Sequence, residues 1–300
     1  MSAFTIMVDS NCDLPPEYLE EHGIEVLSMP FELDGAAHAK GYWQDISGVE
    51  YYGALRGGRV AKTSQINPDA FEAIFSAYAA EGKPLLLILL SSGLSATYEN
   101  ALIALEEVKT SFPACDIHVI DSINATSGHG LLAMLAAEKR AEGLSAREAA
   151  AWLEEKKHSC HAIFTVDDLM YLHRGGRLSK LSAIAGTLLG IKPILNIAPD
   201  GTLCQREKIH GHKAALRKMV EQLKRCVGPE AALDTVLISH TDCPQTAQTL
   251  AEMVGAAVNV RKIVVMLMGP VIGAHLGPGA VTLLFEGDVT REAYESRYYG

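Results

Sequence analysis

The chain has 300 residues, of which 48% are hydrophobic and 21% charged, and its formal net charge is −10. This length fits one large or two medium domains, and the acidic balance argues against nucleic-acid binding, which needs an excess of Lys and Arg. No apolar run approaches the ~20 residues needed to span a bilayer. The N-terminus carries no export signal and the six cysteines form no C-x-x-C pair, so we expect a cytoplasmic protein with reduced thiols.

Short apolar runs alternate with helical patterns in the first half of the chain. Helices are predicted at residues 15–23 and 69–82, after Ser95 and after Thr126. Strands are predicted at residues 4–9, 25–33, 85–90 and 117–121. This alternation predicts a parallel sheet with helices on both faces.

The second half has a different pattern. Strands are predicted there at residues 162–166, 202–209, 234–240, 262–268 and 281–286, and the Ala-Pro-Asp-Gly turn at 198–201 indicates local antiparallel pairing. We therefore predict an α/β protein of two domains. An N-terminal parallel-sheet α/β domain is expected over residues 1–159, and a C-terminal α+β domain over residues 160–300.

Three predicted strands of the first half are followed by serines, namely Ser10, Ser92 and Ser122. Ligands of open parallel sheets bind beyond the carboxyl ends of the strands, so these serines are expected at one rim that holds a binding site. The alternative for each serine is a purely local role in a turn or a helix cap.

The stretch SSGLSATY at 91–98 combines Ser92, Gly93 and Ser95 with no charged residue. Ser95 is expected at the N-terminus of a helix, where free N–H groups and the helix dipole favour an anion such as a carboxylate or a phosphate. The stretch matches neither G-x-S-x-G, nor the Walker motif, nor the dinucleotide fingerprint. It is therefore an anion site without a common motif.

Other polar stretches share this character. Thr63 and Ser64 lie on an expected turn, Arg177 belongs to a cationic glycine loop, and His275 is expected in a glycine-rich loop at 273–280. The histidines and cysteine of HSCH (158–161) and HGH (210–212) match no common zinc spacing, so no metal site is expected.

Several segments, taken in order along the chain, resemble those of the DegV family. They are VDSNCDLP, KTSQ, SSGLSATY, VIDS, DDLMYLHRGGRLS, KPIL followed by DG, and AHLGPGA. This family of fatty acid-binding proteins includes the FakB subunits of bacterial fatty acid kinase, and the resemblance runs from about residue 4 to residue 286. It implies a long-chain fatty acid between two domains, with its carboxylate held by Thr63, Ser95 and His275. Supporting roles are expected for Ser10, Ser64, Ser92, Gly93, Ser122 and Arg177.

The resemblance also implies a carrier without catalytic residues or a cofactor of its own. In the family, a separate ATP-dependent kinase phosphorylates the bound carboxylate, and the acyl phosphate enters phospholipid synthesis. At most transient membrane contact is expected. Two residues depart from the family pattern: Ala96 stands where a glycine is usual, and His210 replaces an arginine associated with the kinase. The second departure leaves open whether a kinase partner exists.

A rival interpretation is an enzyme that acts on a small carboxylated or phosphorylated substrate, with Ser95 as nucleophile and His275 as base. It needs a third group to orient His275, for which Asp9 and Asp121 are the candidates. A dry, enclosed channel is expected for the carrier and an open polar cleft for the enzyme. The channel walls are expected among apolar residues of the second half: Ile163, Phe164, Ile184, Leu188, Leu189, Ile191 and Ile194.

Overall fold

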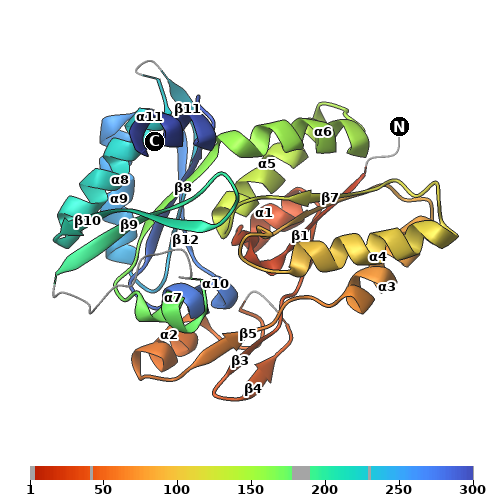
Figure 1. The fold of residues 1–300 in the computed structure, drawn as a ribbon, viewed down its shortest axis with the longest axis horizontal. Helices are drawn as coiled ribbons and strands as arrows, with labels where there is room; N and C mark the ends of the chain where they lie inside the picture. Colours follow the sequence, from red (N-terminus) through yellow and green to blue (C-terminus); the bar gives the residue numbers. More distant parts are fainter. Residues whose placement is uncertain (1–3, 41–42, 178–189, 229–230, 300) are drawn as a thin grey trace.

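The structure is a computed structural model, which describes residues 4–40, 43–177, 190–228 and 231–299. The described strands form three sheets (Figure 1). A four-stranded sheet belongs to the N-terminal half and a six-stranded sheet to the C-terminal half, and a small three-stranded sheet lies below them in this view. None of the described helices is both long and apolar enough to cross a bilayer.

The N-terminal sheet is entirely parallel, as predicted. Its order is β2 (Ile24–Leu27), β1 (Thr5–Asp9), β6 (Leu85–Leu89) and β7 (Ile117–Asp121). Every residue of β6 is buried, which is typical of a parallel strand covered on both faces. Alternate side chains of β6 enter two cores, one with α5 (Ser127–Ala141) and α6 (Ala146–Lys156), the other with α3 (Pro68–Ala80) and α4 (Thr97–Ser111). The short α1 (Pro16–Glu21) packs beside β2.

The prediction of one strand over residues 25–33 was wrong. The chain leaves the parallel sheet after Leu27 and enters another sheet at Phe31, because Pro30 has no N–H for a ladder. The second piece, β3 (Phe31–Leu33), pairs antiparallel with β4 (Ala36–His38) and β5 (Ala61–Thr63). This small sheet and the adjacent α2 (Gly48–Arg56) were not predicted; α2 begins with a capping box between Ser47 and Glu50.

The C-terminal sheet is mixed. Its order is β10 (Leu203–His210), β9 (Ile191–Ile197), β8 (Cys160–Thr165), β13 (Val281–Glu286), β11 (Ala232–His240) and β12 (Asn259–Leu267), and only β11 and β12 pair in parallel. The turn at 198–201 joins β9 and β10 antiparallel, as predicted, whereas β9 itself was not predicted as a strand. The remaining elements are α7 (Met170–Arg174), α8 (His212–Cys226), α9 (Pro244–Ala257), α10 (Pro270–Leu276), α11 (Arg291–Tyr299), and the 3-10 turns η1 (Ser10–Cys12) and η2 (Lys157–Ser159).

The two larger sheets share a core through α5, while α8 and α9 cover the outer face of the C-terminal sheet (Figure 1). Leu131 and Leu132 of α5 pack in the core that contains side chains of both sheets. A Cβ on Gly130 would lie 2.3 Å from the Cys12 carbonyl oxygen, so the helix needs glycine at this point. The predicted α/β architecture with a separate C-terminal sheet is therefore confirmed, and the domain boundary at residue 160 stays a prediction.

A buried arginine, Arg291, also connects the N-terminal and C-terminal halves of the chain by hydrogen bonds. The Arg291 guanidinium donates hydrogen bonds to the carbonyl oxygens of Ile123 (2.7 Å), Ala198 (3.1 Å) and Lys157 (3.3 Å). These carbonyls belong to the loop after β7, the β9–β10 turn and η2. Burial lowers the Arg291 pKa to about 10, so the guanidinium stays charged at neutral pH. The loop that follows β7 is thereby held against the C-terminal sheet.

Candidate functional site

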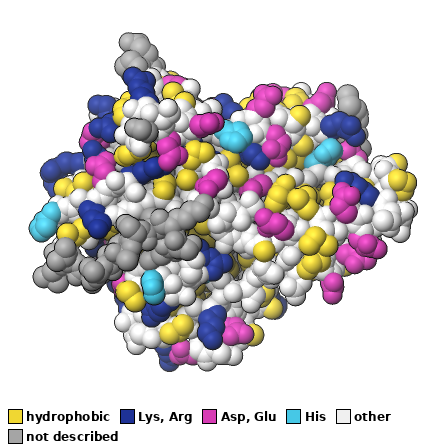
Figure 2. All heavy atoms as spheres, in the orientation of Figure 1, with side chains coloured by type: hydrophobic (Ala, Val, Ile, Leu, Met, Phe, Trp, Pro, Cys, Tyr) yellow, Lys and Arg dark blue, Asp and Glu magenta, His cyan; other side chains and the backbone are white. Residues whose placement is uncertain are grey.

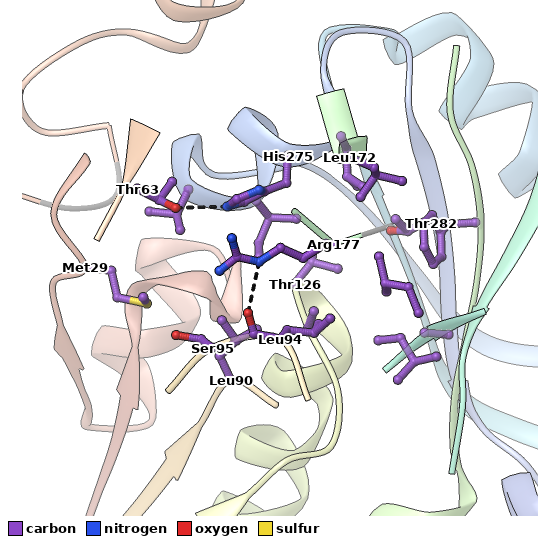
Figure 3. Close-up of a pocket in the computed structure, with 18 of the residues that line it drawn as sticks. Met29, Thr63, Leu90, Leu94, Ser95, Thr126, Leu172, Arg177, His275 and Thr282 are labelled. Carbon is purple, nitrogen blue, oxygen red and sulfur yellow. Dashed lines mark hydrogen bonds between the residues drawn. The ribbon is translucent and has the colours of Figure 1, made fainter. Parts of the chain in front are cut away.

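A cavity of about 390 Å³ lies between the two larger sheets, lined by side chains from both halves of the chain (Figure 3). The C-terminal sheet contributes Ala162, Phe164, Ile197, Leu203 and Leu284, and the N-terminal half contributes Leu90, Leu94 and Ala125. The volume is within the ~300–1,000 Å³ range of small-molecule sites. Most of the lining is apolar, so the cavity suits a greasy ligand.

Of the wall residues predicted in β8 and β9, Phe164 lines the cavity, whereas Ile163 and Ile194 pack in the opposite core under α8. Successive side chains of a strand point to opposite faces, so Ala162 and Phe164 share one face and Ile163 the other. Ile191 does not line the cavity. Ile184, Leu188 and Leu189 lie outside the described residues.

Most of the polar side chains labelled in Figure 3 gather at one end of the cavity. Figure 3 shows Thr63, Ser95, Arg177 and His275 on one side, and Leu172 and Thr282 on the other. Thr63 ends β5, Ser95 precedes α4, and His275 lies in the last turn of α10 rather than in the predicted loop. Three segments far apart in the sequence therefore bring these side chains together.

Hydrogen bonds fix the polar end. Thr63 Oγ1 and His275 Nε2 lie 2.9 Å apart, and Ser95 Oγ lies 2.9 Å from Thr97 Oγ1. The Arg177 Nε donates to the Leu94 carbonyl oxygen at 3.1 Å, so the guanidinium lies against the loop before α4. The backbone of Ala96 has φ −77°, so this loop avoids the positive φ that the usual glycine permits.

His275 is neutral at physiological pH. Burial, with a smaller contribution from the positive charge of Arg177, lowers the His275 pKa to about 4. Its Nδ1 is buried and has no hydrogen-bond partner among the described residues. A Cβ on Gly175 would lie only 2.2 Å from this Nδ1, so the glycine makes room for the imidazole. The polar end thus combines neutral donors with one guanidinium.

Sequence reasoning missed a buried carboxyl group behind the cavity wall. Thr126 lines the cavity in a left-handed conformation (φ 50°), and its hydroxyl donates to Asp13 Oδ2 at 2.5 Å. Asp13 Oδ1 accepts a hydrogen bond from the Gly269 N–H, just before α10, at 2.8 Å. Burial raises the Asp13 pKa to about 7. Asp13 belongs to the DSNCDL stretch, and nothing in that stretch signals a contact 113 residues away.

The serines predicted at the strand ends do follow neighbouring strands, but their hydroxyls form hydrogen bonds within the loops. Ser10 Oγ accepts from the Met29 N–H (3.0 Å), Ser92 Oγ donates to Asp121 Oδ2 (2.5 Å), and Ser122 Oγ donates to the Asn124 carbonyl oxygen (3.0 Å). These three serines do not line the cavity, whereas Ser64 does. Gly93 also lies outside the lining, and a Cβ there would meet the Gly201 backbone at 2.7 Å.

The arrangement required by the rival enzyme is not assembled in the described residues. Ser95 and His275 each have a threonine hydroxyl as partner, and no described carboxylate hydrogen-bonds to His275. Asp9 instead accepts from the Leu90 N–H at 2.7 Å, and Asp121 binds Ser92 and the Ile123 N–H. Searched over the described residues, His, Cys, Asp and Glu form no group of three that could hold a metal ion. The geometry therefore favours binding over nucleophilic catalysis.

Comparisons with known proteins agree with this site. A model of the DegV family, described as uncharacterised proteins, matches residues 3–288. A DegV domain-containing protein of Clostridium perfringens is 37% identical over 289 residues, covering 96% of this chain and 99% of its own length.

Two solved structures are similar over nearly their whole length. A DegV family protein from Thermus thermophilus, described for its fatty acid binding, has 27% identity and a TM-score of 0.85, with 95% of this chain and 100% of that chain covered. DegV from Bacillus subtilis, described as a fatty acid binding protein, has 26% identity and a TM-score of 0.80, with 96% and 100% covered.

Proposed function

The chain belongs to the DegV family, and from this premise we propose that it binds a long-chain fatty acid in the cavity between the sheets, with the carboxylate at Thr63, Ser95 and His275. The observation that carries the proposal is a mostly apolar cavity with Thr63, Ser95 and His275 at one end, whereas the Thr282 hydroxyl on the opposite side is hydrogen-bonded to the Ser239 carbonyl oxygen. Each buried methylene contributes about 0.8 kcal/mol, so a sixteen-carbon chain gains roughly 10 kcal/mol before the costs of association. The acyl chain supplies the affinity and the polar end sets its direction.

The hydrogen bonds of the polar end suit a carboxylate. Because Nδ1 of His275 has no partner among the described residues, we assign its proton to Nε2, which then donates to Thr63 Oγ1. The Thr63 hydroxyl is thereby free to donate to the ligand. Ser95 supplies a second hydroxyl, and a carboxylate taken from water needs such donors. Besides the Arg177 guanidinium, which is engaged with the Leu94 carbonyl oxygen, the donors at this end are neutral, and no lysine is among the described residues that line the cavity.

In this proposal the protein is a cytoplasmic carrier that presents the carboxylate to a separate ATP-dependent kinase. The acyl phosphate formed there serves phospholipid synthesis. The sequence itself carries no Walker motif, which is consistent with a partner that brings the nucleotide. His210 ends β10, where the kinase-linked members have an arginine, so a kinase that binds this chain must use other contacts at that position.

The direct test is mass spectrometry of the freshly purified protein after denaturation. We expect one equivalent of long-chain fatty acid, released only on unfolding. Lipid-free protein from several expression hosts, together with no binding of added palmitate or oleate in calorimetry, would contradict the proposal. Loss of binding to a kinase alone would contradict only the role as a kinase substrate carrier.

Removing single hydroxyls from the polar end is expected to weaken fatty acid binding. Thr63→Val and Ser95→Ala should each raise the Kd about 10-fold, because each removes one hydrogen bond to a charged group. Ser111→Ala, at the exposed end of α4 and outside the cavity lining, serves as the matched control and should change the Kd less than 2-fold. Equal Kd values for all three variants and the natural protein, measured by competition with a fluorescent fatty acid, would place the carboxylate elsewhere.

A methyl group added at Gly175, next to the His275 ring, is expected to weaken fatty acid binding without contacting the ligand. Gly175→Ala sets a Cβ where the Nδ1 now lies, so the imidazole must move and its bond to Thr63 must lengthen. We expect a Kd about 10-fold higher and a changed histidine signal in NMR spectra. Gly53→Ala is the control, because no atom lies within 4 Å of the new Cβ and Gly53 does not line the cavity. An unchanged histidine signal in Gly175→Ala would show that the imidazole had not moved.

A further inference from the structure

A small cavity of about 10 Å³ shares two wall residues, Ala162 and Ile197, with the fatty acid cavity. The strands β8, β9 and β10, the β9–β10 turn and α11 supply the other residues that line it: His161, Asn196, Pro199, Arg206, Arg291 and Tyr294. One water molecule needs a space of ~10–15 Å³. The small cavity therefore has room for one water molecule or for an ion of similar size.

Three buried polar atoms of these walls lack a hydrogen-bond partner within the described part of the chain. They are Arg206 Nε, Arg291 Nε and Asn196 Oδ1. Arg291 and Asn196 are 4% and 7% exposed, and the Arg206 side chain is 11% exposed. A buried polar atom without a partner is costly, so three of them around one cavity indicate a small polar ligand.

The direction of the Asn196 amide is set by its other contacts. Its Nδ2 donates to the Ala162 carbonyl oxygen and to Gln222 Oε1, each at 3.3 Å. Both of these oxygens are acceptors, so exchanging the amide nitrogen and oxygen of Asn196 would break both hydrogen bonds. Oδ1 therefore remains the unpartnered atom, and it requires a donor.

The two guanidinium groups require the opposite kind of partner. Arg206 Nη2 lies 2.9 Å from a Glu295 carboxylate oxygen, and Arg291 donates to three carbonyl oxygens through its Nη atoms. Each Nε–H is left to donate, because a guanidinium has no acceptor. Figure 2 shows Lys and Arg side chains at the surface around α8 and β10, where solvent hydrates them. The Nε atoms of Arg206 and Arg291 are buried, so bulk water does not reach them.

We propose that the small cavity binds one water molecule, which accepts hydrogen bonds from Arg206 Nε and Arg291 Nε and donates one to Asn196 Oδ1, and that this water forms a polar barrier at the wall of the fatty acid cavity. A water molecule has two lone pairs and two protons, which match two donors and one acceptor. A chloride ion cannot donate to the Asn196 oxygen, and an ammonium ion cannot accept from the guanidinium groups. The barrier, unlike the water site itself, rests on the proposed function.

The bound water distinguishes this part of the wall from the rest of the fatty acid cavity. An acyl chain that passed Ile197 would displace the water and leave two guanidinium N–H groups and an amide oxygen without partners. Leu284, in contrast, lines the fatty acid cavity but not the small one, and it packs in the apolar core. Space that opens at Leu284 stays dry, whereas space that opens at Ile197 fills with water.

A high-resolution crystal structure of the full chain tests the water site directly. We expect one peak of electron density, with the height of an oxygen atom, within ~2.7–3.2 Å of the three unpartnered atoms. Crystals soaked in sodium bromide should show no anomalous signal at this place. A bromide signal there, or no density at all, would overturn the assignment.

Arg206→Lys removes the Nε–H donor and keeps a positive charge beside Glu295. We expect its melting temperature to fall by about 2 °C and the water peak to weaken, because one hydrogen bond between a charged group and the water is lost. Arg217→Lys, exposed on α8, is the matched control and should change neither. An unchanged water peak in Arg206→Lys would show that Arg206 does not hold the water.

The barrier is tested by the relative Kd values of stearate and palmitate. In Leu284→Ala the ratio of the stearate Kd to the palmitate Kd should fall about 10-fold, because two more methylenes are buried. In Ile197→Ala the same ratio should stay within 2-fold of that of the natural protein. Equal changes of the ratio in the two variants, whether large or small, would contradict the barrier. If the natural protein binds neither fatty acid, the proposed function fails, whereas the crystallographic test of the water site still decides that part.

Discussion

Replacing Ala162 by phenylalanine is expected to empty the protein of fatty acid while leaving it folded. Ala162 lies on β8, is buried, and lines the cavity beside Phe164. A phenyl ring at this position occupies space that the acyl chain needs. We expect less than a tenth of the natural amount of lipid in the purified variant, measured by mass spectrometry after denaturation.

The same substitution is not expected to lower the stability of the folded protein. This separates the loss of fatty acid from a loss of folding. Filling an apolar cavity adds dispersion contacts, so the lipid-free variant should unfold at the same or a higher temperature than the lipid-free natural protein. A graded series of Ala162→Val, Ala162→Leu and Ala162→Phe should favour progressively shorter fatty acids. Retention of the natural fatty acid by the Phe variant would show that the chain does not lie in this cavity.

The parts of the fold that sequence reasoning predicted correctly are those specified by local patterns. The uniformly apolar residues 85–89 form β6 in the N-terminal sheet. Pro68 begins α3, and the aromatic residues between 71 and 78 lie on one face of that helix. The Ala-Pro-Asp-Gly turn forms the β9–β10 hairpin because Gly201 adopts φ 77°. In each case short-range chemistry and tertiary packing favour the same structure.

The parts that were missed depend on tertiary contacts. Residues 25–33 read as one strand, because the pattern of side chains does not reveal that Pro30 separates two sheets. The segment 270–276 contains a glycine and a proline and is flanked by two more glycines, yet it forms α10. Its Gly273 packs where a Cβ would lie 2.4 Å from the Tyr52 hydroxyl, and Tyr51 donates to the Pro270 carbonyl oxygen. Such partners, more than 200 residues distant, leave no periodic signal in the sequence.

For the site, the strand ends and the family resemblance pointed to different residues, and only Ser95 was assigned an anion-binding role both from its local sequence and from the resemblance. The strand ends pointed to Ser10, Ser92 and Ser122. Their strands are adjacent, but their hydroxyls form hydrogen bonds within the neighbouring loops. The resemblance named Thr63, Ser95 and His275, which line the cavity although they come from three separate elements. Their role toward a carboxylate remains a proposal. Arg177 was named only as a supporting residue, although it lines the cavity and donates to the Leu94 carbonyl oxygen beside Ser95.

The structure also explains why a buried carboxyl group can influence this site without touching it. Asp13 accepts hydrogen bonds from Thr126, on the cavity wall, and from the N–H of Gly269, which caps the helix that carries His275. Thr126 has φ 50° and ψ −143°, a conformation that costs an ordinary residue about 1–3 kcal/mol. Its bond to Asp13 offsets that cost. The wall and α10 thus depend on one ionisable group.

The stability of the protein is therefore expected to depend on pH through Asp13. Its pKa is about 7 in the folded protein and 3.8 in the unfolded chain, so the folded state binds more protons between these values. The stabilisation is complete below pH 4 and is lost as the pH rises to 7. Between pH 5 and pH 8 the contribution of Asp13 to the free energy of unfolding should fall by about 2.5 kcal/mol.

Asp13→Asn isolates this contribution. Asparagine keeps the acceptor for the Gly269 N–H and can donate to Thr126 Oγ1, but it does not titrate. His161 and His275, whose pKa values are lowered to about 4, oppose the trend in both proteins and cancel in the difference. Urea unfolding at several pH values should show the variant gaining on the natural protein as the pH rises from 5 to 8. A constant difference between the two proteins would mean that Asp13 does not change its protonation state in this range, and that the cavity wall rests on a carboxylate charged throughout.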